Sequence, residues 1–133
     1  MDAGATPGTR APDGSVRDGL TVRLVTSGRT VVMHVTGEID MTSVARLRDA
    51  TADLAAGLAE RSVSLVVLDL SEVAYMGSAG MAWLVESRQR VGERNAALRV
   101  VASAPALTRP LNAVGLLAVL DVRPTLAAAL DQN

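Results

Sequence analysis

The chain of 133 residues contains no cysteine, no lysine and no phenylalanine, and its only histidine is His34. A Cys/His zinc site and a cysteine nucleophile are therefore excluded. The absence of lysine excludes a standard phosphate-binding P-loop and Schiff-base chemistry. One Trp and one Tyr are too few for a surface on which bases stack. We therefore expect neither a metal site nor a cofactor.

Neither positive nor negative charge predominates in the chain. The 13 basic residues are all Arg, and 14 acidic residues balance them to a net charge of −1. This balance is not typical of a nucleic-acid interface or of a polybasic membrane surface. The longest uncharged stretch, Val73–Val85, has 13 residues, fewer than a membrane-spanning helix needs, and no signal peptide is evident at the N-terminus. We expect a cytoplasmic protein that contacts neither membrane nor nucleic acid directly.

Small and branched residues make up most of the apolar part of the chain, with 22 Ala, 18 Val and 17 Leu. Apolar residues reach 49% and charged residues 20%, which is typical of a globular domain, and the length suits one domain. Residues 1–19 hold four Gly and two Pro and almost no large apolar residue. We predict a flexible tail over 1–19 and a folded domain over 20–133.

Hydrophobic periodicity predicts alternating strands and helices after an initial hairpin. The expected strands are Leu20–Thr26, Thr30–Thr36, Val63–Leu70, Leu98–Ala102 and Leu117–Val122. The expected helices are a segment with Val44, Leu47, Thr51, Leu54 and Leu58 on one face, then Ser78–Val91, Pro105–Val114 and Pro124–Leu130. This order predicts an α/β fold: one mixed, mostly parallel sheet of about five strands with four helices.

Sites in such sheets lie outside the carboxyl ends of the strands. The corresponding loops are Gly37–Thr42, Ser71–Ser78 and Ser103–Pro105. We therefore expect Asp40 and Ser78 to share one edge of the molecule.

Ser78 has two interpretations that the local sequence leaves open. It stands before an amphipathic helix, so it is either an N-cap or a reactive or modified hydroxyl. A serine hydrolase does not fit, because Met76 stands where a nucleophile elbow has Gly and His34 precedes the Ser. Glu38 and Asp40, two residues apart, are typical of a solvated loop rather than of a glycosidase pair. We expect no enzyme activity.

The remaining candidate functional residues are His34, Asp69 and Trp83. His34 has no second His for a metal site, and Asp69 in a buried strand needs a structural partner. On a helical wheel the apolar stripe of the second helix runs through Met81, Leu84 and Val85, which places Trp83 on the outer face. There Trp83 is either an interface anchor or is covered by a neighbouring segment.

Three segments resemble the STAS domain in its anti-anti-sigma factor form. They are VVMHVTGEIDMTSVARLR (31–48), VVLDLSEVAYMGSAGMAWLV (66–85) and LRVVASAPALTRPLNAVGL (98–116). The likeness, with matching spacing, runs from about Leu20 to Leu130. It implies a bacterial domain that binds a serine-kinase anti-sigma factor and so releases a sigma factor. In that family the kinase phosphorylates a Ser of a D-S-S/T/A-G motif, which ends binding, and a serine phosphatase reverses the modification.

The resemblance assigns roles by motif position. Ser78 matches the phosphorylated Ser, Asp40 matches the Asp of the GE(L/I)D loop, and Gly77 stands where the motif has Asp. The Gly77 departure favours an alternative, a STAS scaffold or binding subunit that is not phosphorylated. The residues expected to bind the partner are Glu38, Asp40, Thr42, Gly77, Ser78, Ala79, Gly80, Trp83, Glu86 and Arg90.

Overall fold

The computed structural model describes residues 16–17 and 19–131. In this part of the chain, six strands form one sheet in chain order. They are β1 (Val16–Arg17), β2 (Leu20–Ser27), β3 (Thr30–Ile39), β4 (Leu65–Met76), β5 (Ala97–Val101) and β6 (Val122–Arg123). The pairs β1–β2 and β2–β3 are antiparallel, and the pairs from β3 to β6 are parallel. The expectation of a mixed, mostly parallel sheet is confirmed.

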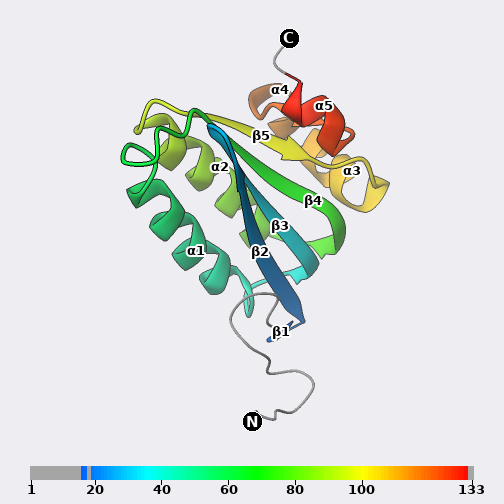
Figure 1. The fold of residues 1–133 in the computed structure, drawn as a ribbon. Coiled ribbons are helices and arrows are strands. Elements are labelled where there is room, and N and C mark those ends of the chain that lie inside the picture. Colours follow the sequence, from blue (N-terminus) through cyan, green and yellow to red (C-terminus); the bar gives the residue numbers. More distant parts are fainter. Residues whose placement is uncertain (1–15, 18, 132–133) are drawn as a thin grey trace.

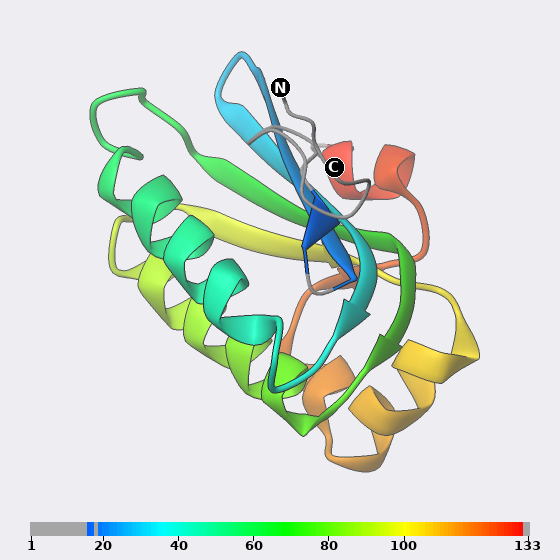
Figure 2. The ribbon, with the colours of Figure 1, turned by 90° about the horizontal axis from the view of Figure 1, so that it is seen from below.

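Five helices connect or follow the strands of the described chain. They are α1 (Val44–Ala56), α2 (Ser78–Gly92), α3 (Pro105–Ala113), α4 (Leu116–Val119) and α5 (Leu126–Leu130). Figures 1 and 2 show α1 and α2 lying side by side against the sheet, with α5 well away from them beside β5. The elements beyond the expected five strands and four helices are the short β1 and α4. None of the described helices has the length and apolar character to cross a bilayer.

The central strand β4 holds the two parts of the core together. Val66, Leu68 and Leu70 pack into the large cluster that the helical layer covers, whereas Leu65 and Val67 belong to a smaller cluster with Ala129 of α5. Both faces of the first half of β4 are therefore buried. The run Val63–Leu70 is mostly apolar and interrupted only by Ser64 and Asp69, a pattern that predicts a strand covered on two sides, and this prediction is confirmed.

The structure describes only a small part of the expected tail over residues 1–19. Most of the expected tail, residues 1–15 and 18, lies outside the described residues. Val16 and Arg17, which were also assigned to the tail, form β1 and pair with Leu20 and Thr21 in the sheet.

The bounds expected for the last strand, Leu117–Val122, are wrong. Gly115 adopts a left-handed conformation with φ +80°, and the chain then makes the single helical turn α4, closed by the bond from Leu120 N–H to the Leu116 carbonyl at 2.8 Å. Only Val122 and Arg123 remain to pair with β5. A short apolar run is compatible with either a helix or a strand. Here the helical turn provides the hydrogen bond of the Leu120 N–H, and the Leu120 side chain is buried.

Candidate functional site

The carboxyl ends of β3 and β4 form one continuous edge. The two strands stay paired to their last residues, Ile39 beside Met76, and the Gly77 N–H then donates to the Ile39 carbonyl at 2.9 Å. The loop that carries Asp40 therefore lies beside the start of the helix that carries Ser78, as the topology predicted. The strands are longer than expected, however, because residues 37–39 and 71–76 are strand rather than loop.

Gly37 makes the extension of β3 possible. Its φ of +116° is a conformation that L side chains rarely adopt, and a Cβ there would lie only 1.9 Å from the Gly19 carbonyl oxygen. The strand register also shifts between Gly37 and Glu38, where the Glu38 N–H donates to the Gly19 carbonyl at 3.3 Å. This irregular step directs the chain toward Asp40.

Asp40 organises the loop between β3 and α1. Its Oδ1 accepts the Thr42 hydroxyl at 2.7 Å, the Thr42 N–H at 2.9 Å and the Ser43 N–H at 3.2 Å. The buried Ser43 hydroxyl donates to the Glu38 carbonyl at 2.9 Å and accepts the Asp40 N–H at 3.0 Å. Ser43 is the N-cap residue of α1, but its side chain makes no cap bond, and the Asp40 backbone carbonyl accepts the N–H of Val44, the first residue of the helix, at 2.9 Å.

These bonds make the loop sensitive to acid. The Thr42 hydroxyl, followed by the Thr42 and Ser43 N–H groups, lowers the pKa of Asp40 below its ordinary value of 3.8. A carboxyl whose pKa is lower in the folded state than in the unfolded state stabilises the fold at pH values above its unfolded-state pKa. This stabilisation disappears as the pH falls through the folded-state pKa. We expect Asp40→Asn to lower the thermal midpoint at neutral pH, with the difference from wild type shrinking below pH 3.8.

The matched control is Asp53→Asn, which changes an exposed carboxylate in the middle of α1. Thermal unfolding followed by circular dichroism across the acid range measures both variants. A difference between wild type and Asp40→Asn that stays constant through the acid range would contradict the role assigned to the carboxylate.

Ser78 is the first residue of α2, and the N-cap residue is Gly77. The N-cap interpretation of Ser78 is therefore wrong, because the helix start carries no side-chain cap bond. Ser78 is exposed, and no described residue hydrogen-bonds its hydroxyl. The hydroxyl is thus open to a partner or to modification.

Exposed apolar side chains accompany Ser78 along this edge. Met41 in the neighbouring loop is 85% exposed, Tyr75 at the end of β4 is 52% exposed and Val85 of α2 is 41% exposed. Ala82 and Val85 follow Ser78 at four and seven residues, so they continue the same face of the helix. We name Met41, Tyr75, Ser78, Ala82 and Val85 the Ser78 surface. Exposed apolar groups gathered in this way are typical of a protein-binding surface.

The STAS domain family model matches residues 21–129 of this chain. The chain belongs to the STAS domain family. Three similar proteins illustrate what its relatives do. The anti-sigma-F factor antagonist RsfB of Mycobacterium tuberculosis is 29% identical over 87% of this chain and 91% of its own. The putative anti-anti-sigma factor Rv2638 of the same organism is 32% identical over 85% of this chain and 76% of its own. The crystal structure of an anti-sigma factor antagonist from Mycobacterium paratuberculosis superposes with a TM-score of 0.76 at 33% identity, over 85% and 92% of the two chains.

Trp83 of the STAS domain lies in the core, not on the outer face of α2. Its side chain is 1% exposed, and its indole N–H donates to the Thr51 hydroxyl of α1 at 2.9 Å. Thr51 in turn donates to the Leu47 carbonyl at 2.7 Å. Trp83 therefore joins α2 to α1, and its expected role in partner binding is corrected.

The buried stripe of α2 consists of Gly80, Trp83, Leu84, Ser87 and Val91. Gly80 packs so tightly that a Cβ there would lie 2.4 Å from Met76 Cγ and 2.9 Å from Ile39 Cγ2. Gly80 is thus a packing residue and not part of the surface. The helical-wheel prediction was wrong because it considered only the large apolar residues of α2. The closest contact of α2 with the sheet is made at a small residue, Gly80.

The other expected partner residues remain accessible. Glu38, Thr42, Glu86 and Arg90 are exposed, while Asp40, Gly77 and Ala79 are partly buried. Glu86 is held by Arg48 of α1 through two bonds of 2.9 and 3.2 Å, so this carboxylate is already paired. Arg90 lies with Glu86, Gln89 and Glu93 around a shallow depression of about 270 Å³.

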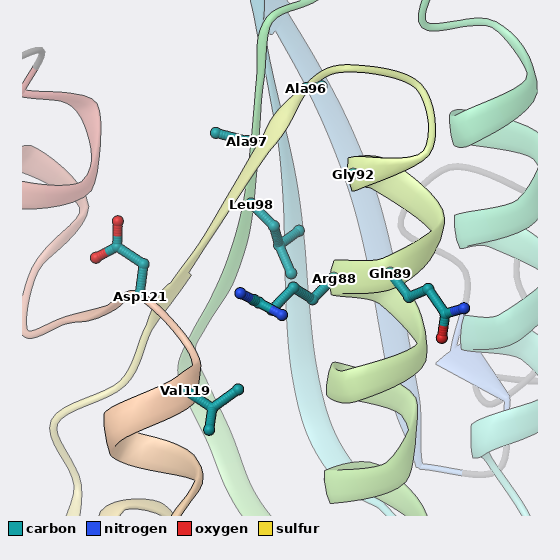
Figure 3. Close-up of a pocket in the computed structure, with 8 residues that line it drawn as sticks. All are labelled: Arg88, Gln89, Gly92, Ala96, Ala97, Leu98, Val119 and Asp121. Carbon is teal, nitrogen blue, oxygen red and sulfur yellow. The ribbon is translucent and has the colours of Figure 1, made fainter.

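A second groove of the STAS domain, about 450 Å³ in volume, lies beside the C-terminal end of α2 (Figure 3). Its lining consists of Arg88, Gln89, Gly92, Ala96, Ala97, Leu98, Val119 and Asp121. Leu98 and Val119 supply apolar surface, and Asp121 bonds Arg123 at 2.6 Å. The groove includes no residue of the Ser78 surface.

His34 and Asp69 pair across β3 and β4, which gives Asp69 its expected structural partner. His34 Nδ1 lies 2.8 Å from Asp69 Oδ2, and the Ser71 hydroxyl donates to Asp69 Oδ1 at 2.7 Å. The carboxylate stands between the imidazole and the hydroxyl. Activation of a serine nucleophile requires the imidazole in the middle, so this cluster does not have the geometry of a catalytic triad. Among the described residues, no group of three or more His, Asp or Glu is placed to hold a metal ion.

Proposed function

We propose that this STAS domain is an anti-sigma factor antagonist. It binds a serine-kinase anti-sigma factor in the cytoplasm and so releases a sigma factor. The names of its relatives and the match over residues 21–129 support this assignment. The observation that carries the proposal is the exposed Ser78 hydroxyl, which makes no cap bond at the start of α2.

The partner binds over the Ser78 surface and the adjoining Glu38, Thr42 and Arg90. Met41, Tyr75 and Val85 offer apolar area, and burial of such area drives association. The ionised Asp40 keeps the loop that carries Met41 and Thr42 in one conformation. With the chain's charges nearly balanced, the interaction is with protein rather than with nucleic acid or membrane.

Phosphorylation of Ser78 by the partner ends binding. A phosphate adds about −1.5 to −2 charges at pH 7. At the N-terminus of a 15-residue helix, free N–H groups and the helix dipole tolerate an anion, so the domain keeps its fold. Within an interface that buries Met41 and Val85, the same charge is desolvated and weakens association. A serine phosphatase then restores the binding form.

The test is affinity capture from the native cytoplasm, read by mass spectrometry, with wild-type, Ser78→Glu and Ser27→Glu baits. Ser27 is an exposed serine at the far end of the β2–β3 hairpin, so its variant is the matched control. We expect wild type and Ser27→Glu to capture a small serine kinase of the anti-sigma type, and Ser78→Glu to lose at least about tenfold of it, the effect of 1.4 kcal/mol. Circular dichroism should be the same for all three.

The second candidate is a STAS scaffold that is not switched by phosphorylation, and Gly77 in place of the family's Asp favours it. Equal capture of the same partner by the wild-type and Ser78→Glu baits would support this scaffold and overturn the switch. Capture of no kinase by any bait would overturn the proposed partner as well.

A further inference from the structure

The end of β4 places a phenol directly beside the start of α2. Tyr75 and Gly77 are two residues apart in extended backbone, so their side-chain positions lie on the same side of the chain. A Cβ added at Gly77 would lie 3.1 Å from the Tyr75 hydroxyl and 3.5 and 3.6 Å from two of its ring carbons. The tip of the Tyr75 ring therefore occupies the space into which a side chain at position 77 would extend.

This arrangement changes the chemistry next to Ser78. The motif that the chain resembles has a carboxylate at position 77, which is an acceptor only and repels a phosphate. The phenol here is neutral and can donate its proton. No described residue hydrogen-bonds the Tyr75 hydroxyl, and the ring is half exposed. The hydroxyl is thus free to serve a group that is added to Ser78.

We propose that Tyr75 holds the phosphate of phosphorylated Ser78, with its phenolic O–H donating to a phosphate oxygen. This inference rests on the proposed phosphorylation of Ser78 and adds a residue that the switch motif does not contain. A hydrogen bond to an ionised oxygen is shorter and stronger than one between neutral groups. Tyr75 therefore stabilises the modified form of the chain, and Gly77 is the residue whose missing side chain leaves room for it.

The test places the phosphate without any kinase. The chain is produced with genetically encoded phosphoserine at position 78, in wild-type and Tyr75→Phe backgrounds, and the second pKa of the phosphate is followed by ³¹P NMR. A donor to the dianion lowers that pKa, so we expect Tyr75→Phe to raise it by about 0.5. Glu38 and Asp40 in the neighbouring loop are the same in both proteins, so the difference isolates the phenol.

Two controls make the result decisive. Gly77→Asp adds a negative charge beside the phosphate and should raise its second pKa further, which shows that the resonance senses position 77. Phosphoserine at Ser27, at the far end of the hairpin, should titrate alike with and without the Tyr75 hydroxyl. Identical titrations of the Ser78 phosphate with Tyr and Phe at position 75, or an equal change at Ser27, would overturn the role of Tyr75. Because no kinase is used, this outcome is independent of whether the capture experiment finds a partner.

Discussion

Replacing Trp83 with alanine is expected to lower the free energy of unfolding by about 4 kcal/mol, the middle of the range for a buried aromatic side chain. Trp83 is 1% exposed and fills the contact between α1 and α2. Its removal leaves a cavity there and takes the indole donor from the buried Thr51 hydroxyl. Urea unfolding followed by circular dichroism at 222 nm, a wavelength that reports helix, measures the change.

Two further variants separate the cavity from the hydrogen bond. Trp83→Phe keeps most of the apolar volume and loses the N–H, so it should cost about 1–2 kcal/mol, the range for one buried bond and an unpaired partner. Val85→Ala removes apolar atoms from the exposed side of the same helix and should change stability by less than about 0.5 kcal/mol. If Trp83→Ala were no more destabilising than Val85→Ala, Trp83 would belong to the surface after all.

The second large effect is expected at Gly37. Alanine there must adopt a φ near +116° and place its Cβ against the Gly19 carbonyl oxygen, which belongs to the backbone and cannot swing away. We expect a loss of about 3–5 kcal/mol, the sum of backbone strain and the displacement of a neighbouring segment. Chemical denaturation measures the loss, and the chemical shifts of Glu38 to Thr42 should move as the loop is displaced.

Gly28→Ala is the matched control for this prediction. Gly28 has φ +58°, but nothing lies within 4 Å of the position of its Cβ. Only the conformational strain remains, so the variant should lose about 1–2 kcal/mol. Equal losses at Gly28 and Gly37 would show that the approach of Gly19 to Gly37 contributes nothing.

The sequence predicts the fold well because periodicity and order are local properties. The mostly apolar run Val63–Leu70 indicated a strand buried on both faces, and the parallel order of the strands placed Asp40 beside Ser78. The lengths of β3 and β4 were not predictable in the same way. Residue types such as Gly and Glu are uncommon within strands. At Gly37, Ser71 and Glu72 the chain stays extended because β3 and β4 pair with each other.

The sequence brought Asp40 and Ser78 together, but it misplaced Trp83 and Gly80 on the surface and did not point to Tyr75. The helical wheel placed Trp83 outside because it took no account of the small residues Gly80 and Ser87 on the buried face of α2, where Gly80 lets the helix approach β3 and β4. The true stripe left Val85 exposed instead. Tyr75 was missed because Gly77 had been considered only as a lost carboxylate. The spacing of two residues between Tyr75 and Gly77 is visible in the sequence. The packing of the Tyr75 ring against Gly77 is not.

The bond from the Gly77 N–H to the Ile39 carbonyl has a thermodynamic consequence for recognition. It connects the start of the Asp40 loop to the start of α2 in the free protein. Binding at this edge then requires little loss of backbone conformational entropy on this side of the interface. Association with the proposed partner should consequently proceed with small backbone displacement at this edge of the STAS domain.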